Sequence, residues 1–308
     1  MNRLVYSNGA YLRSMQITGA QLFAFVEGGL DRPFVERLLK SIDPQIRHRI
    51  VAAKELPGST GGKNRVIEWF KGLRDKKMLA SQVWGKKFFA IFFLDKDADD
   101  FKNKLLRSDH VAYTTTYDLE GMIFNCTDFH SGLADAALIT LDQAKELMPS
   151  FEDWLKSIAQ NWIDWVTLCL LTNFEGVNCG CGFDRLSEVN PDRLGSPDII
   201  KIEQYKQIAR QKLGIPVQEF SALYEKYRKR VDATHKRGQH LRYFKGKWLH
   251  SLLQLHCERA KKVEDWNVRS IGEKLTIALL GQIGNSQRCA CCAPFHARLQ
   301  LGLEFVSA

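Results

Sequence analysis

The N-terminal part of the chain alternates short apolar runs with amphipathic stretches. The apolar runs are continuous, which is typical of strands buried in a parallel sheet, and they lie at residues 21–26, 49–53, 88–93 and 110–116. Helices are predicted between them, one capped by Asp31, one after Gly62 and a polar one at 101–107. Strands that alternate with helices predict an α/β fold with a parallel sheet and flanking helices.

From about residue 141 onward the pattern changes to helical spacing. Apolar residues recur at helical intervals over 151–172, and further helices are predicted at 203–213, 217–231, 247–261 and 268–280. Residues 176–195 are rich in Gly, Asn and Pro and predict a loop. We therefore expect an α/β domain over residues 18–135 and a mainly α-helical domain over residues 141–308.

Carboxylates follow the predicted strands at the points where these strands end. Glu27 follows the first strand, Asp95 and Asp97 follow the third, and Glu120 follows the fourth. The carboxyl ends of parallel strands lie along one edge of a sheet, so these side chains are expected to converge. Such oxygen ligands suit Mg²⁺ or Mn²⁺ better than zinc, and a site of this kind supports phosphoryl transfer. The alternative for each acid alone is a solvated loop.

The chain is basic, with a formal net charge of +9, which favours a polyanionic partner. Nine cations and a single acid lie in residues 226–247, and aromatic residues are interleaved with them. Cations bind phosphates and aromatics stack on unpaired bases, as expected of an RNA-binding surface; the alternative is a solvated helix face. The residues predicted to bind nucleic acid are Lys63, Lys229, Arg230, Lys236, Arg237, Arg242, Lys245 and Lys247.

Several other classes of site are not expected. The N-terminus has no apolar stretch of the secretory type and no run is long enough to span a bilayer, so we expect a cytoplasmic protein without a membrane partner.

Eight cysteines are then expected to be reduced thiols. The Cys-x-Cys spacings at Cys179 and Cys289 are tighter than those of zinc knuckles, so structural zinc is not favoured. Pro57 stands where a P-loop needs glycine, so no nucleotide cofactor is expected.

Four stretches together resemble a known family. Val26-Glu27-Gly28 before a helix, followed later by Leu94-Asp95-Lys96-Asp97, is similar to the TOPRIM domain of topoisomerases, primases and OLD-type nucleases. The stretches at residues 25–34 and 61–63, with Tyr117-Asp118-Leu119-Glu120-Gly121, resemble the OLD-like TOPRIM nucleases encoded beside ABC-type ATPases in bacterial defence loci. These motifs cover residues 20–125, and the helical half carries a looser likeness.

The resemblance implies a role for each matching position. Glu27 would be a metal ligand or the acid/base carboxylate, Asp95 and Asp97 metal ligands, and Glu120 a further acidic member of the site. It implies Mg²⁺ or Mn²⁺ as cofactor and RNA, with tRNA favoured, as substrate. It also implies a partner ABC-type ATPase that holds the nuclease inactive until a phage protein triggers its release.

Two alternatives stay open at this point. The same acidic chemistry serves a DNA nuclease or nickase of the OLD type, and the sequence does not distinguish the sugars. A non-catalytic regulatory subunit of the ATPase complex, with vestigial acids, is the alternative from another class. A homodimer is compatible with the sequence, but no residue pattern argues for it.

Overall fold

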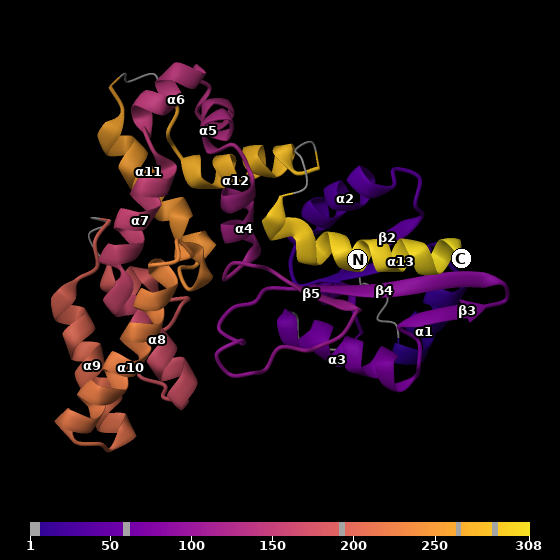
Figure 1. The fold of residues 1–308 in the computed structure, drawn as a ribbon, viewed down its shortest axis with the longest axis horizontal. Coiled ribbons are helices and arrows are strands. Elements are labelled where there is room, and N and C mark those ends of the chain that lie inside the picture. Colours follow the sequence, from indigo (N-terminus) through magenta and orange to yellow (C-terminus); the bar gives the residue numbers. More distant parts are fainter. Residues whose placement is uncertain (1–6, 58–61, 191–194, 263–265, 285–288) are drawn as a thin grey trace. The chain divides into compact units, whose positions relative to one another are not determined.

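The computed structural model describes residues 7–57, 62–190, 195–262, 266–284 and 289–308, and it divides into two compact units (Figure 1). The sheet unit consists of residues 1–96, 106–115 and 282–308, and the helical unit of residues 97–105 and 116–281. The helix that starts at Ala293 thus lies in the sheet unit, and residues 116–135 lie in the helical unit.

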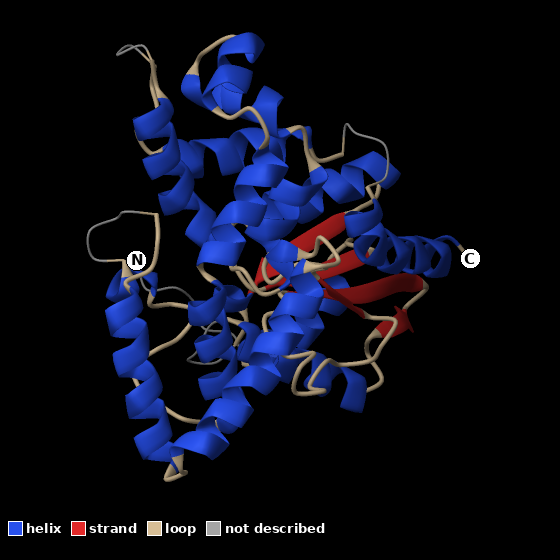
Figure 2. Ribbon diagram, turned by 60° about the vertical axis from the view of Figure 1, so that its left-hand side comes forward, coloured by secondary structure: helices blue, strands red, loops and turns tan. Residues whose placement is uncertain are grey.

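The sheet unit is built on five strands, drawn in red in Figure 2. They are β1 (Leu22–Val26), β2 (His48–Ala52), β3 (Ala80–Val83), β4 (Lys86–Leu94) and β5 (Val111–Tyr113). The order is β2-β1-β4-β3, and β5 also pairs with β4. All of these pairings are parallel except that of β3 with β4. The predicted α/β class with a parallel sheet and flanking helices is therefore confirmed.

Helices cover both faces of this sheet. Side chains alternate across a strand, so Phe25 of β1 and Phe92 of β4 share one face, with their rings stacked at 4.8 Å. That face packs against α1 (Asn8–Ile17) and α3 (Lys63–Asp75) in one apolar core.

The opposite face packs against α2 (Asp31–Ile42) and α13 (Ala293–Ser307). Phe295 of α13 stacks on Phe93 of β4 with ring centroids 5.0 Å apart, and it meets Phe34 of α2 edge to face. Gly302 allows α13 to lie close to the strands, since a Cβ there would be 2.7 Å from Leu22 Cδ2. The C-terminal helix is therefore part of the core of the sheet unit.

The helical unit comprises nine helices among its described residues. They are α4 (Leu119–Cys126), α5 (Phe129–Ala137), α6 (Leu141–Leu147), α7 (Phe151–Asn161), α8 (Ile163–Glu175), α9 (Ile199–Leu213), α10 (Val217–His235), α11 (Gly246–Ala260) and α12 (Ile271–Gln282). Many begin at a side-chain cap, such as Asp128 for α5, Thr140 for α6 and Ser150 for α7. Helix α8 is the central one, with Trp165 and most of its neighbours fully buried. The predicted helical C-terminal region is thus confirmed.

Two local predictions were wrong, and one strand was not predicted. Residues 101–103 form a turn and residues 104–107 have no regular structure, and the buried Phe101 ring packs on Tyr243 with ring centroids 4.5 Å apart. The helix expected at 151–172 breaks at Trp162, whose indole N–H donates to the Gly195 carbonyl at 3.0 Å. Strand β3 was missed because its hairpin turn holds Trp84 at φ 49°, which is unusual for a large residue.

None of the helices within the described ranges has both the length and the apolar character that a membrane crossing requires.

Candidate functional site

The sheet unit places Glu27 and Asp95 side by side. Glu27 directly follows β1 and Asp95 directly follows β4, and these strands are adjacent and parallel, with Val26 opposite Phe93. The Glu27 carboxylate accepts a hydrogen bond from the backbone N–H of Asp95 at 2.8 Å. Both residues are half-buried. The carboxyl ends of two neighbouring strands therefore bring two acidic residues together, which suits a site for a hard divalent cation.

The loops around this pair are ordered by short polar contacts. Asp31 forms the first turn of α2, and its carboxylate accepts the Gly28 N–H at 2.7 Å. It therefore stabilises the turn after Glu27 and does not act as the N-cap of α2, which is Leu30. After β4, the Lys96 N–H donates to Thr114 Oγ1 at 2.8 Å. These contacts fix the backbone on both sides of Glu27 and Asp95.

Lys63, the first residue of α3, also reaches the end of β4. Its ammonium donates to the backbone carbonyl of Asp95 and lies 5.7 Å from the centre of the Tyr113 ring. Gly62 precedes it at φ 78°, a conformation that glycine adopts without strain. Gly61 of the same stretch lies outside the described residues. A cation is thus held next to the two acidic residues.

Asp97 and Glu120 belong to the helical unit, where each has contacts of its own. Asp97 has a left-handed backbone, with φ 49°, and its N–H donates to the Tyr117 carbonyl at 2.7 Å. Its own carbonyl accepts from Arg242 Nη1 at 2.9 Å. Glu120 lies in the first turn of α4 and is 7% exposed, with one carboxylate oxygen 3.7 Å from Lys247 Nζ.

The most constrained acid of the helical unit is Asp118, two residues before Glu120. Its carboxylate accepts from Gly121 N at 3.0 Å, the N-cap contact of α4. The same carboxylate accepts from Gly246 N at 2.9 Å and Lys247 N at 3.4 Å, in the first turn of α11. One side chain thus caps two helices, which satisfies backbone donors that would otherwise be unpaired.

Burial, followed by the neighbouring negative charge of Glu120, raises the pKa of Asp118 to about 6. The three backbone N–H donors oppose this shift, because they stabilise the charged form. Sequence reasoning does not single out Asp118. Its position just before the apolar run at 119–124 is typical of a helix-capping residue. No feature of the sequence indicates that Asp118 also contacts α11.

The basic segment 226–247 is only partly a surface. Arg242 is 7% exposed and forms an ion pair with Asp100, and the half-buried Lys245 pairs with Asp184. Both cations therefore have acidic partners inside the protein, and the phosphate-binding role predicted for them stays a prediction. The aromatic residues of the segment do not form the expected stacking surface, since all are 0–9% exposed: His235, His240, Tyr243, Phe244 and Trp248.

Five of the predicted cations do lie on the surface of the helical unit. They are Lys229, Arg230, Lys236, Arg237 and Lys247. The Arg230 guanidinium lies 3.6 Å from the centre of the Phe101 ring, a cation–π contact that leaves it exposed. The surface that fits a polyanion is therefore smaller than the sequence indicated, and it is carried by α10 and the residues after it.

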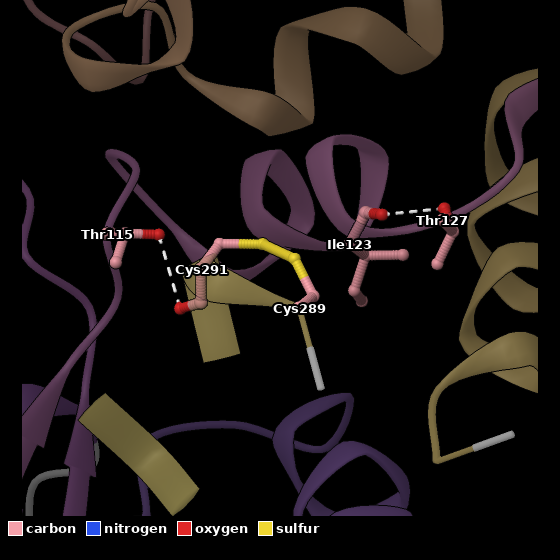
Figure 3. Close-up of a disulfide and its surroundings, with 5 residues drawn as sticks. All are labelled: Thr115, Ile123, Thr127, Cys289 and Cys291. Carbon is pink, nitrogen blue, oxygen red and sulfur yellow. Dashed lines mark hydrogen bonds between the residues drawn. A yellow bond between two sulfur atoms is a disulfide. The ribbon is translucent and has the colours of Figure 1, made fainter. Parts of the chain in front are cut away.

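One pair of cysteines differs from the expectation of reduced thiols. Cys289 and Cys291 form a disulfide at the start of η4 (Ala290–Cys292), with Cα atoms 5.4 Å apart (Figure 3). The Thr115 hydroxyl donates to the Cys291 carbonyl at 3.5 Å, which ties this turn to the end of β5. The separation of the two Cα atoms lies within the range that disulfides span.

Comparison of the chain with models of known protein families gave no match, and no curated protein matches it.

The close approach of α4 and α11 gives a first test. A Cβ at Gly246 would be 2.0 Å from the backbone nitrogen of Gly121, whereas a Cβ at Gly281 in α12 would have no atom within 4 Å. We expect Gly246→Ala to lower the free energy of unfolding by about 1–3 kcal/mol, because backbone must move. The matched Gly281→Ala should raise it by up to about 1 kcal/mol, since alanine favours helix. Urea unfolding measures both, and equal effects would contradict the packing described.

The pKa of Asp118 predicts a pH dependence of stability. The folded pKa is raised from 3.8 to about 6, so the folded state binds this proton more tightly than the unfolded state. Protonation of Asp118 therefore adds on the order of 3 kcal/mol to the free energy of unfolding. This contribution is fully present below pH 3.8 and is lost as the pH rises through about 6.

The test compares the unfolding free energy of the wild type and of Asp118→Asn from pH 4 to pH 7. Asparagine does not titrate, so the stability difference between the two proteins should change over this range, with the wild type losing more as the pH rises. Other titrating groups cancel in the comparison. A difference that is constant with pH would contradict the raised pKa.

Proposed function

We propose that this protein is a metal-dependent nuclease with a TOPRIM-like catalytic site. The observation that carries the proposal is the pairing of Glu27 and Asp95 at the carboxyl ends of the adjacent parallel strands β1 and β4. Asp97 follows Asp95 by two residues, so chain connectivity keeps their Cα atoms within about 7 Å. These acids match, position by position, the motifs on which the resemblance to TOPRIM nucleases rests.

The donor set fits the cation that this class of nuclease uses. Glu27, Asp95 and Asp97 would hold Mg²⁺ or Mn²⁺ through carboxylate oxygens, the ligands that hard cations prefer. A cation there supplies Lewis-acid stabilisation of the phosphate and acidifies a water molecule. Glu27 orients the loop by accepting the Asp95 N–H, and Lys63 places a positive charge at the same strand end. Glu120 would be a further acid of the site.

The substrate and partners follow from the resemblance and the charge. RNA, and tRNA in particular, is the favoured substrate, and Lys229, Arg230, Lys236, Arg237 and Lys247 supply the exposed positive charge. Among TOPRIM nucleases the motifs look most like those of AriB, the effector of the PARIS anti-phage system. The protein would then act in the cytoplasm as a toxic effector, held inactive by an ABC-type ATPase until a phage protein triggers it.

The decisive variant is Glu27→Gln. Glutamine keeps an oxygen that can accept the Asp95 N–H, but it removes the negative charge that a metal requires. We expect cleavage to fall at least about a hundredfold. The rise in melting temperature that Mg²⁺ or Mn²⁺ gives the wild type should disappear, while the melting temperature in EDTA stays unchanged. Glu68→Gln, on the exposed side of α3, is the matched control and should behave as the wild type.

The assay uses total tRNA, single-stranded DNA and double-stranded DNA, each with Mg²⁺ or EDTA and with or without the partner ATPase and its trigger. Cutting confined to DNA would contradict the RNA substrate and identify a nickase or DNA nuclease instead. Retained cutting by Glu27→Gln would place the active site elsewhere. A wild type that neither cuts under any condition nor responds to metal would identify a non-catalytic subunit.

The exposed cations predict a salt-dependent RNA affinity. Lys236→Gln combined with Arg237→Gln should weaken tRNA binding and reduce the slope of log K against log salt by about 0.7 for each phosphate that these side chains neutralise. Lys145→Gln with Lys262→Gln removes the same charge from α6 and the end of α11 and is the control. Fluorescence anisotropy over a salt series measures the tRNA affinity of both double variants. If the two variants lose affinity equally, net charge alone determines the affinity and the prediction is wrong.

A further inference from the structure

Two cysteines lie in contact in the segment that follows α8, within the helical unit. Cys179 and Cys181 have their sulfur atoms 2.9 Å apart, and both are free thiols. Gly180 between them has φ 85°, so the chain can turn tightly enough to bring the two side chains to the same side. The pair is therefore placed by the backbone as well as by its own contact.

The surroundings distinguish the two sulfurs. Cys179 is 6% exposed and Cys181 is half-buried, with its sulfur 3.3 Å from Thr172 Oγ1. The hydrogen bond with Cys181, backbone hydrogen bonds and the charge of Lys212 together lower the pKa of Cys179 to about 6, against the opposing effect of burial. The same contact raises the pKa of Cys181. The opposite directions of these shifts make Cys179 the more acidic thiol of the pair.

A metal is a weaker explanation for this pair than redox chemistry. Within the described part of the chain, no third ligand atom from His, Cys, Asp or Glu lies within 4.8 Å of both sulfurs. Thiolate sites for soft metals generally need three or four ligands. By contrast, a disulfide at the same Cys-x-Cys spacing is present in this chain, between Cys289 and Cys291.

We propose that Cys179 and Cys181 are a redox-active dithiol that a hydroperoxide oxidises to an intramolecular disulfide. A small oxidant is required because Cys179 is almost fully covered. The inference does not depend on the proposed nuclease function.

The reaction proceeds in two steps. The Cys179 thiolate attacks one peroxide oxygen, so that an S–O bond forms, the O–O bond breaks, and the departing oxygen takes up a proton as water or alcohol. Cys181 then loses its proton and attacks the Cys179 sulfur, so that the S–S bond forms and the S–O bond breaks, with hydroxide leaving as water. The two sulfurs together lose two electrons, and the peroxide gains them.

The experiment treats the full-length, reduced protein with one equivalent of hydrogen peroxide, blocks the remaining thiols with N-ethylmaleimide and digests with trypsin. The tryptic peptide 157–185 contains Cys169, Cys179 and Cys181. We expect this peptide to lose two hydrogens, with Cys169 alkylated and the other two cysteines protected. This oxidation should be at least about tenfold faster than modification of the buried Cys257.

Variants separate the two roles. Cys181→Ser should stop at the sulfenic acid, which dimedone traps on residue 179, and Cys179→Ser should give no rapid trapping at residue 181. Cys257→Ser is the matched control and should form the disulfide as the wild type does, and circular dichroism confirms that each variant is folded. A folded wild type whose peptide keeps all three thiols, or which joins Cys169 to either partner, would overturn the proposal.

Discussion

One buried carboxylate organises the helical unit. Asp118 lies between the first turns of α4 and α11 and accepts backbone N–H groups from both. The unpaired donors and the positive dipole ends of two helices meet there, which offsets the free-energy cost of burying this acid. Glu120 and Lys247 each lie within one turn of this junction and 3.7 Å from each other. A contact that serves the fold therefore also positions two charged residues of the helical unit relative to each other.

The features of the fold that could be predicted from the sequence are those that depend on patterns of nearby residues. Continuous apolar runs located β1, β2 and β4, and the rule that parallel strands end at one edge correctly indicated that Glu27 and Asp95 would be neighbours. Features that depend on distant contacts were missed. Nothing in the residues at 101–107 reports that Phe101 is anchored by Tyr243, and nothing near the last helix reports that Phe295 will stack on Phe93.

The basic segment shows the limit of counting charges. A sequence gives the number of cations in 226–247 but not the acids that lie opposite them in the fold. Asp100 precedes its partner Arg242 by 142 residues, and Asp184 precedes its partner Lys245 by 61. The aromatic residues between the cations were needed for packing, because large rings gain most from burial. What remains for a ligand is the exposed cations of α10 and the residues that follow it.

The position of α13 has a consequence for the order of synthesis. The apolar face formed by Leu22, Phe89 and Ile91 is covered by a helix that begins only at Ala293, so the ribosome makes this helix after all five strands. Domains generally fold as they emerge, and contacts between distant residues form late. The sheet would therefore keep this face uncovered while residues 116–281 of the helical unit are synthesised. A nascent chain of this kind is exposed to aggregation until α13 is made.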